Sequence, residues 1–317
     1  MTGKRMQIDC IIADWGTSNR RAWALTADGS VLAERHDDQG LLAIADHRFA
    51  ESFQRFCGDW LGSSRMIPII MAGMVGSKLG WQEVPYQMAP VALRDLSRHL
   101  SKIEDPLIGE VWIAPGVALD DGKQLEVMRG EECQILGALL QSDEMDGTFL
   151  LPGTHSKWAQ VKDGRIISFR TYMTGEVYGL LRKSGTINQL MEGDIVNDEA
   201  FKQGVLYSRE PDAGNLLHSL FSVRTLGLFD RLPRADLPSY MSGLLIGAEV
   251  YDATSWLADH DHAGGITAIG SPALLEAYQQ AAASLEIELI SIDSNSLLPL
   301  AMLSLAKAAG ILSGARA

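Results

Sequence analysis

The sequence predicts an α/β protein built from two similar domains, and three observations lead to this fold class. The chain has 317 residues, about twice the length of an ordinary domain. Short apolar runs alternate along it with segments whose apolar residues recur at helical spacing. A strand–turn–strand pattern at the N-terminus returns near the middle of the chain. We therefore expect two α/β domains, residues 1–145 and 146–317, that face each other across a cleft.

The first half opens with a three-stranded meander. Its strands are expected over residues 7–13, 20–26 and 31–35, with one turn at 16–19 and a tighter turn at Asp28-Gly29. The elements expected next are a helix over 46–61, a strand over 66–71, a glycine-rich loop over 72–77, a helix over 91–103, a strand over 111–114 and a helix over 131–140.

The second half repeats this opening. The recurring features are Gly16-Thr17 as Gly153-Thr154, Trp23 as Trp158 and Asp28-Gly29 as Asp163-Gly164, at offsets of 137, 135 and 135 residues. Three features in the same order favour a duplicated domain over two unrelated hairpins. The elements expected here are strands over 148–151, 158–161, 166–169, 266–269 and 288–292, and helices over 215–229, 241–257, 273–285 and 297–309.

Charge and cysteine content exclude several classes of protein. The formal net charge of −13 argues against a nucleic acid or an anionic membrane as partner, because both need a basic surface. Cys10, Cys57 and Cys133 are too few and too far apart for a disulfide framework, and neither they nor the seven histidines have the spacing of transition-metal ligands. The N-terminus is a poor signal peptide, and Lys307 interrupts the apolar segment 297–312, which suits a packed helix better than a membrane span. We expect a cytoplasmic enzyme.

Two domains that each open with a tight hairpin can hold a nucleoside triphosphate. Backbone N–H groups and hydroxyls of the loops bind the phosphates, and a carboxylate at the end of the first strand holds Mg²⁺, usually through water. Asp14 stands at that position, whereas Pro152 stands near it in the second copy. The candidate metal and phosphate ligands are therefore Asp14, Gly16, Thr17, Ser18, Asn19 and Arg21 in the first hairpin, and Gly153, Thr154, His155, Ser156 and Lys157 in the second loop.

Several motifs resemble one kinase family. The segment IADWGTSNRRAW (12–23) is similar to the phosphate-binding start of the sugar-kinase, actin and heat-shock ATPase superfamily. The segments AGMVGS (72–77), GW (80–81), VMRGEE (127–132), LPGTHSKW (151–158) and MTGE (173–176) narrow the resemblance to the 2-dehydro-3-deoxygalactonokinase family. It covers most of the chain in order. It implies the two-domain actin-like ATPase fold, a duplicated ribonuclease-H-like architecture, and ATP-dependent phosphorylation of 2-dehydro-3-deoxygalactonate on its terminal hydroxyl.

Phosphoryl transfer to an alcohol also needs a base for the hydroxyl proton. Related kinases place an acidic residue after a glycine at a helix start, about twenty residues before the second phosphate loop. Gly130-Glu131 lies 22 residues before Gly153, so Glu131 is the expected base, with Glu132 as the alternative. Acidic residues are also common in the first turn of a helix for purely electrostatic reasons.

A small sugar acid needs a cation or hydroxyl donors for its carboxylate and further groups for its hydroxyls. The candidate substrate ligands are Gly76, Ser77, Lys78 and Arg129 around the carboxylate, and Glu83 and Tyr86 near the hydroxyls. The family pattern often has Arg where Lys78 stands and Thr where Ser18 stands; a Lys keeps the charge but loses the two-pronged geometry. Gly270-Ser271, before Pro272, matches the position of the superfamily's adenosine-binding turn, although an ordinary strand-to-helix connection has the same pattern.

The sequence leaves alternatives open. In the preferred interpretation ATP is bound by the second half together with the first hairpin, the sugar acid is bound by the first half, and segment 174–176 is a hinge loop. Nothing in the pattern distinguishes a galactonate-derived from a gluconate-derived acid, and a homodimer is common for such enzymes. A non-kinase actin-like ATPase that acts as a binding module would need an additional domain. A ribonuclease-H-like nuclease would need a basic groove, which the charge disfavours.

Overall fold

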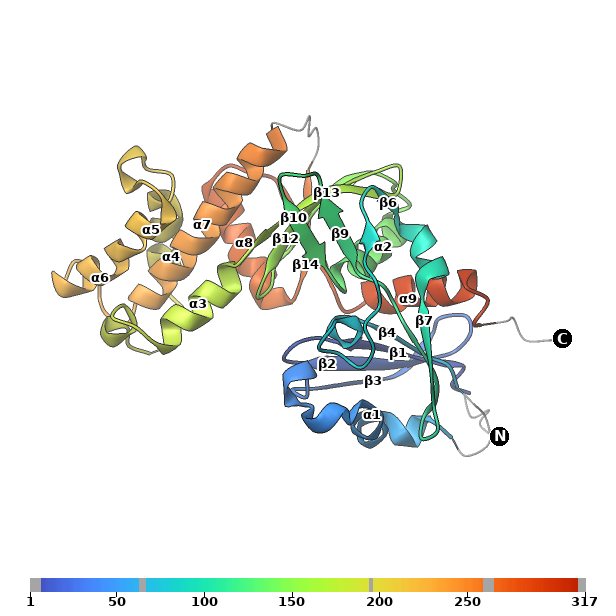
Figure 1. The fold of residues 1–317 in the computed structure, drawn as a ribbon. Coiled ribbons are helices and arrows are strands. Elements are labelled where there is room, and N and C mark those ends of the chain that lie inside the picture. Colours follow the sequence, from blue (N-terminus) through green and yellow to red (C-terminus); the bar gives the residue numbers. More distant parts are fainter. Residues whose placement is uncertain (1–6, 63–66, 194–195, 259–264, 313–317) are drawn as a thin grey trace, which may run out of the picture. The chain divides into compact units, whose positions relative to one another are not determined.

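The structure, a computed structural model, describes residues 7–62, 67–193, 196–258 and 265–312 (Figure 1). The chain divides into two compact units. The first unit contains residues 1–146, 161–168 and 294–317, and the second contains 147–160 and 169–293. The assignment of separate roles to residues 1–145 and 146–317 stays a prediction. Within the described ranges, each helix is too short or too polar to cross a bilayer.

The first unit is built on a six-stranded sheet. Its strands are β1 (Cys10–Trp15), β2 (Arg20–Leu25), β3 (Val31–Asp37), β4 (Ile69–Ala72), β7 (Ser101–Asp105) and β8 (Gly109–Ile113). They lie in the order β3-β2-β1-β4-β8-β7, with β1, β4 and β8 parallel and the others antiparallel to their neighbours. The predicted meander is confirmed. The strand predicted over 66–71 begins at Ile69, and its residue 66 lies outside the described ranges.

The core of this unit forms where helix α1 (Phe49–Cys57) covers the sheet. Phe49 and Phe53 pack on the indole of Trp15 with ring centroids 5.5 and 6.1 Å apart. Apolar residues occupy all of β1 and β4 except Asp14, because parallel central strands are buried on both faces. The one carboxylate in β1 therefore stands out as a functional candidate.

The helix predicted over 91–103 is wrong. The segment forms a short strand β6 (Val91–Ala92), a 3₁₀ helix (Leu93–His99) and strand β7. Leu93 and Leu96 are buried at a spacing of three, which suits a 3₁₀ turn as well as an α-helix. In β7 exposed Lys102 and Glu104 alternate with half-buried residues, which is the period of a strand.

A small sheet between these elements was not predicted from the sequence. Strands β5 (Gln87–Met88), β9 (Val117–Asp120) and β10 (Leu125–Met128) lie in the order β10-β9-β5. The predicted helix over 131–140 is confirmed as α2 (Glu131–Ser142), and that over 297–309 as α9 (Leu297–Ala308). These two helices pack closely at Gly137. A Cβ at this position would lie 2.3 Å from the carbonyl oxygen of Leu297, so a larger residue would not fit.

The sheet that begins the second half repeats the strand order of the first. Its strands are β11 (Gly147–Leu151), β12 (Ser156–Lys162), β13 (Arg165–Tyr172), β14 (Ile266–Gly270) and β15 (Leu289–Asp293). A sixth strand, β6 from the first half of the chain, pairs with β13 at the edge of this sheet. The order of the other five, β13-β12-β11-β14-β15, corresponds strand for strand to β3-β2-β1-β4-β8. In each sheet the strand that opens the meander pairs in parallel with a later strand. The two sheets therefore share the topology that the repeated turn motifs predict.

Helices make up the rest of the second unit. They are α3 (Thr174–Lys183), α4 (Asp198–Tyr207), α5 (Leu216–Ser219), α6 (Phe221–Leu228), α7 (Leu237–Ala258) and α8 (Pro272–Ser284). The single helix predicted over 215–229 is wrong, since the structure divides it into α5 and α6 at Leu220. The loop predicted over 174–176 is also wrong, because these residues form the first turn of α3; their role as a hinge stays a prediction.

Candidate active site

Asp14 is the penultimate residue of β1, and only Trp15 separates it from the first loop. Its Oδ2 accepts a hydrogen bond from Arg21 Nη2 at 3.0 Å, and Arg21 Nη1 donates to Asn295 Oδ1. The Asp14 side chain is 19% exposed. The carboxylate is therefore oriented by a cation on β2 yet remains accessible to a ligand.

Gly40 and its neighbours hold the backbone of the first loop, residues 16–19, through hydrogen bonds. The backbone N–H groups of Gly40, Leu41 and Leu42 donate to the carbonyl oxygens of Ser18, Gly16 and Thr17. A Cβ on Gly40 would lie 2.3 Å from the carbonyl carbon of Ser18, so only glycine fits against the loop. Thr17, Ser18 and Asn19 are exposed, as phosphate ligands must be.

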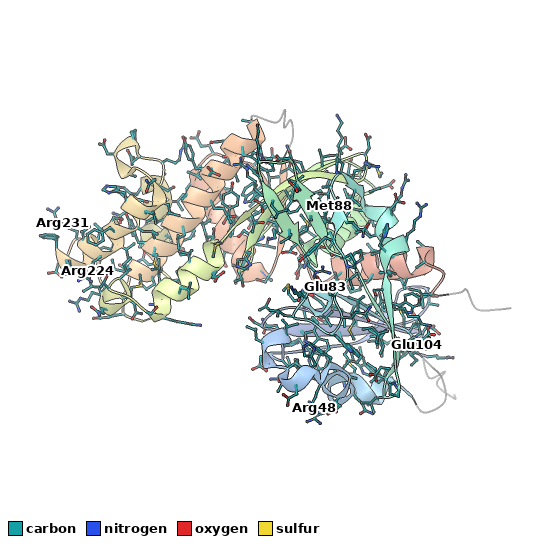
Figure 2. All side chains as sticks on the ribbon, viewed as in Figure 1. Arg48, Glu83, Met88, Glu104, Arg224 and Arg231 are labelled. Atoms are coloured by element: carbon teal, nitrogen blue, oxygen red, sulfur yellow. The ribbon has the colours of Figure 1, made fainter. Side chains whose placement is uncertain are left out.

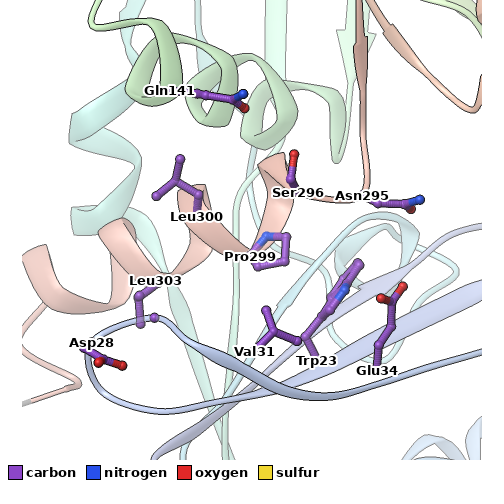
Figure 3. A pocket seen from close by; sticks show the side chains of 11 residues that line it. Trp23, Asp28, Val31, Glu34, Gln141, Asn295, Ser296, Pro299, Leu300 and Leu303 are labelled. Atoms are coloured by element: carbon purple, nitrogen blue, oxygen red, sulfur yellow. The ribbon is translucent and has the colours of Figure 1, made fainter.

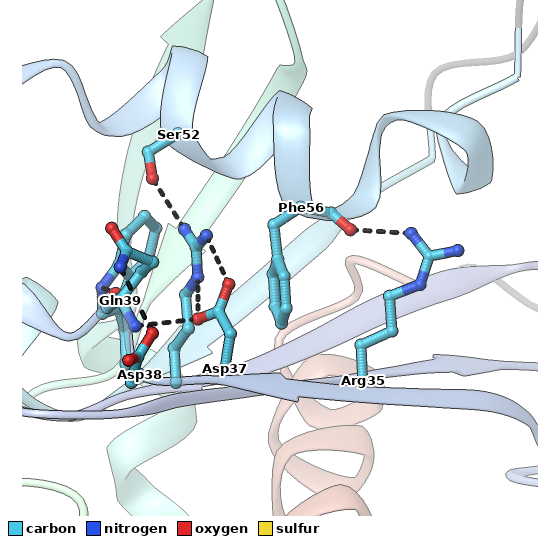
Figure 4. A network of polar contacts seen from close by, with 8 residues as sticks. Arg35, Asp37, Asp38, Gln39, Ser52 and Phe56 are labelled. Atoms are coloured by element: carbon cyan, nitrogen blue, oxygen red, sulfur yellow. Dashed lines mark hydrogen bonds and ion pairs between the residues drawn. The ribbon is translucent and has the colours of Figure 1, made fainter.

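Buried Arg20 connects that supporting segment to the sheet, and its partners Asp37 and Ser52 are labelled in Figure 4. Arg20 Nε and Nη2 donate to Oδ1 and Oδ2 of Asp37 at 2.8 and 2.9 Å, and Nη1 donates to Ser52 Oγ at 2.8 Å. Trp15 Nε1 donates to the carbonyl oxygen of Gln39. Sequence reasoning missed this network, although a charged residue that opens a buried strand is a signal in itself.

Two glycines bring helix α2 to Asp14. Gly130, with φ of 112°, directly precedes the helix, and Gly73 has φ of 92°; both values lie where side chains are strained. A Cβ on Gly130 would lie 3.4 Å from Gly73 Cα, and one on Gly73 would lie 3.0 Å from Asp14 Oδ1. The structure therefore places the start of α2, with Glu131, beside Asp14.

The two acidic residues at the start of α2 have different environments. Glu131 is half-buried, and its Oε2 accepts from the backbone N–H of Arg129 at 2.9 Å. Glu132 is fully buried and accepts from the backbone N–H of Gly130 with both oxygens, at 2.8 and 2.9 Å. Burial, and then the charge of Glu131, raise the pKa of Glu132 to about 7. Only Glu131 is accessible to a substrate hydroxyl.

Of the predicted substrate ligands, Gly76, Ser77, Tyr86 and Arg129 lie together. The guanidinium carbon of Arg129 is 4.2 Å from the centroid of the Tyr86 ring, and Nη2 donates to the carbonyl oxygen of Val84 at 2.7 Å. A Cβ on Gly76 would lie 2.9 Å from Arg129 Nη1. The other two predicted ligands, Lys78 and Glu83, are exposed, and Glu83 is labelled in Figure 2.

The second loop follows β11 in the second unit. Thr154 and His155 are exposed, whereas Ser156 and Lys157 are buried. His155 Nε2 lies 2.5 Å from Glu176 Oε2, and Lys157 Nζ donates to Thr171 Oγ1 at 3.0 Å. The side chains of the loop are thus divided between solvent and the interior of this unit.

Helix α3 begins directly against this loop. The backbone N–H of Glu176 donates to the carbonyl oxygen of Thr154 at 2.9 Å. A Cβ on Gly175 would lie 2.3 Å from the carbonyl oxygen of Gly153. Gly175 therefore permits the helix to contact the loop backbone directly.

A buried carboxyl group supports the same loop from inside the unit. Glu249 Oε1 and Oε2 accept from Trp158 Nε1 at 2.8 Å and from the Tyr278 hydroxyl at 2.7 Å, and that hydroxyl lies 2.9 Å from Ser156 Oγ. Burial raises the pKa of Glu249. The network joins α7 and α8 to the strand that follows the loop.

Gly270 and Ser271 lie next to the second loop, as their predicted role requires. A Cβ on Gly270 would lie 3.5 Å from Pro152 Cδ. Ser271 is exposed and precedes α8, with Pro272 at the first helical position. The structure thus brings together the predicted nucleotide ligands of the second unit.

Two pockets lie apart from the predicted ligands. One, of about 610 Å³, is lined in the first unit by residues of β2, β3 and α9, among them Trp23, Glu34 and Pro299 (Figure 3). The other, of about 430 Å³, is lined in the second unit by Thr174, Glu249 and residues of α5 and α7. Within the described ranges, groups of three or more potential metal-ligating residues are absent.

The repeated sheets, with an acidic residue ending the first strand, define a protein of the actin-like ATPase fold. The family model for 2-keto-3-deoxy-galactonokinase matches residues 14–305. The 2-dehydro-3-deoxygalactonokinase of Escherichia coli K12 is 32% identical over 298 residues, which are 94% of this chain and 97% of that protein. The chain belongs to the 2-keto-3-deoxy-galactonokinase family. It is a sugar-acid kinase, and its family implies the use of ATP.

Solved structures agree with this assignment. A candidate 2-dehydro-3-deoxygalactonokinase from Sinorhizobium meliloti has a TM-score of 0.86 at 32% identity, over 94% of this chain and 98% of that chain. Component A of the (R)-2-hydroxyglutaryl-CoA dehydratase of Acidaminococcus fermentans has a TM-score of 0.53 at 11% identity, over 96% of this chain and 100% of that chain. The second similarity concerns the fold alone.

Proposed function

We propose that this kinase transfers the γ-phosphoryl group of ATP to the terminal hydroxyl of 2-dehydro-3-deoxygalactonate, with Asp14 and Glu131 as its catalytic carboxylates. The observation that carries the proposal is the series of close approaches from Asp14 through Gly73 to Gly130, which puts both carboxylates at one end of the first sheet. Phosphoryl transfer depends mainly on positioning and charge stabilisation, so a rigid pair of carboxylates suits it.

Mg²⁺ fits the surroundings of Asp14. This cation usually takes one or two protein carboxylates, and phosphate oxygens and water complete its shell. A Cβ on Gly73 would lie 3.0 Å from Asp14 Oδ1, so glycine at this position keeps a side chain away from that oxygen. Bound there, the ion would offset the negative charge of the phosphates. The first hairpin supplies the neighbouring phosphate ligands in this proposal, namely Gly16, Thr17, Ser18 and Asn19 of the loop and Arg21 of β2.

Glu131 acts as the base in this proposal. As the substrate oxygen bonds to phosphorus, its hydroxyl proton passes to the Glu131 carboxylate, while the bond from phosphorus to the ADP oxygen breaks. Glu131 is half-buried in the first turn of α2, so its carboxylate remains accessible to a substrate hydroxyl. Glu132 is fully buried and therefore cannot reach a substrate hydroxyl, so it is not the base in this proposal.

The second unit supplies the remaining ATP ligands. Exposed Thr154 and His155 are suited to contact phosphates directly, while buried Ser156 and Lys157 would act by supporting the loop. Gly270 and Ser271 would contact the adenosine. The use of ATP and the sugar acid as substrates is consistent with a cytoplasmic enzyme.

A coupled assay of ADP release tests the proposal. The substrates are the keto-deoxy acids derived from galactonate and from gluconate, and we expect turnover with the former to be faster. Asp14→Asn should keep the fold and lose nearly all turnover. Asp28→Asn is the matched control, because Asp28 is an exposed turn residue of the same meander. Wild-type turnover of Asp14→Asn at saturating Mg²⁺ would contradict the role of Asp14, and a preference for the gluconate-derived acid would change the substrate.

A further inference from the structure

The strongest unexplained feature of the first unit is a buried cation with unused donors. Arg129 is 7% exposed, and within the described residues its Nε and Nη1 make no hydrogen bond. The hydroxyl of Ser77, which is 8% exposed, is likewise without a hydrogen bond there. A buried charge is normally paired, because burial removes its hydration.

The guanidinium is held in place by groups that do not neutralise it. The Tyr86 ring contacts its face and the carbonyl oxygen of Val84 accepts from Nη2, while Nε and Nη1 have no hydrogen-bond partner among the described residues. Glu131 accepts only from the backbone N–H of Arg129. Aromatic and carbonyl contacts orient a guanidinium and leave its charge available to an anion.

Gly76 brings the hydroxyl and the guanidinium together. A Cβ on Gly76 would lie 2.9 Å from Arg129 Nη1, so this nitrogen rests against the backbone that carries Ser77. Arg129, two residues before Glu131, therefore has two unused nitrogen donors next to the residue that precedes Ser77, whose hydroxyl is also unused among the described residues. A carboxylate has two oxygens that each accept more than one hydrogen bond, and it supplies the missing negative charge.

We infer that Arg129 and Ser77 bind the carboxylate of the sugar acid and thereby select acids over neutral sugars. This inference takes the identity of the substrate from the proposed function. The negative charge of the ligand is inferred from Arg129 and does not depend on that function. The carboxylate is assigned to Arg129 rather than to Lys78, which is exposed and therefore remains hydrated. The site lies wholly within the first unit.

The test compares two variants on two substrates. Arg129→Met replaces the charged guanidinium with an unbranched apolar side chain. We expect kcat/KM for the keto-deoxy acid to fall on the order of 100-fold, mainly through a higher KM. The primary amide of the same acid has no charge, so kcat/KM for the amide should change less than about threefold. Ser77→Ala should weaken use of the acid about tenfold. Arg98→Met is the matched control, because Arg98 is an exposed arginine of the same unit.

Thermal unfolding separates a binding role from a structural one. Without ligand, Arg129→Met should unfold at the wild-type temperature or above, because it removes an unpaired buried charge. The keto-deoxy acid alone should stabilise the wild type but not this variant. Equal losses on acid and amide, or a larger loss for Lys78→Met than for Arg129→Met, would overturn the inference. If the wild type instead prefers another sugar acid with the same Arg129 dependence, the inference stands and the proposed substrate fails.

Discussion

Arg20 and Asp37 form a two-point ion pair beside the first phosphate loop. Arg20 Nε and Nη2 contact the two carboxylate oxygens of Asp37, and its guanidinium carbon lies 4.2 Å from the centroid of the Phe56 ring. Arg20 directly follows the loop, and Asp37 leads into the segment that contacts the loop backbone through Gly40. The pair therefore connects strand β2, which follows the loop, to the segment whose backbone holds the loop.

Loss of this pair should destabilise the first unit. We expect Arg20→Met to lower the free energy of unfolding by about 2–4 kcal/mol, because Asp37 loses its partner and Ser52 loses a donor. Arg20→Lys should cost roughly half as much, since it keeps the charge without the two-point geometry. Urea unfolding followed by tryptophan fluorescence measures both. Arg48→Met, at an arginine that is 61% exposed, is the control and should change the value by less than about 0.5 kcal/mol.

Gly40 should control the affinity for ATP. In Gly40→Ala the new methyl group would lie 2.3–2.5 Å from backbone atoms of Thr17 and Ser18, so the first loop must move. We expect KM for ATP to rise at least tenfold, while KM for the sugar acid changes little. Gly179→Ala is the control, because a Cβ there meets no atom within 4 Å. An unchanged KM for ATP in Gly40→Ala would show that the loop does not bind the nucleotide.

The sequence predicted most of the fold because its signals are local. Turn dipeptides such as Asp163-Gly164 and short apolar runs locate both meanders, and their repetition predicts the shared topology. The prediction failed over 91–103, where Leu93 and Leu96 fit two kinds of helix and the strand that follows is set by pairing with β8. Contacts between distant segments leave no comparable local pattern.

The same distinction applies to the site. Asp14 and Glu131 could be proposed from the sequence because each stands at a recognisable junction of elements, and their catalytic roles stay predictions. The roles of Arg20 and Gly40 depend on contacts with residues far away in the sequence, such as Ser52 and Ser18, so one sequence does not reveal them. Lys157 is buried against Thr171 for a similar reason, because β12 begins inside the predicted loop.

Stability should fall as the pH rises through the range in which Glu132 ionises. Its pKa is raised from 4.5 to about 7 in the folded protein, so the unfolded state loses this proton at lower pH than the folded state. The stabilisation is therefore complete below about pH 4.5 and is lost as the pH approaches 7, with a magnitude on the order of 3 kcal/mol. Glu132→Gln should remove this dependence and be the more stable protein at pH 8. Unfolding experiments across pH 5–8 measure the difference, and parallel profiles for both proteins would refute it.

Glu131 should determine the rate of the chemical step. Glu131→Gln keeps the size of the side chain and an oxygen that can accept from the backbone N–H of Arg129, but it cannot take a proton. We therefore expect kcat and kcat/KM to fall together, by on the order of 10²–10⁴, with little change in the affinity for the sugar acid. Glu132→Gln should remain active, because the fully buried Glu132 contacts the backbone rather than a ligand. Steady-state kinetics of the two variants at pH 7.5 distinguish the outcomes. If Glu132→Gln is the slow variant, the base is Glu132 and a rearrangement of α2 must expose it; if both are fast, the proton goes to a different group.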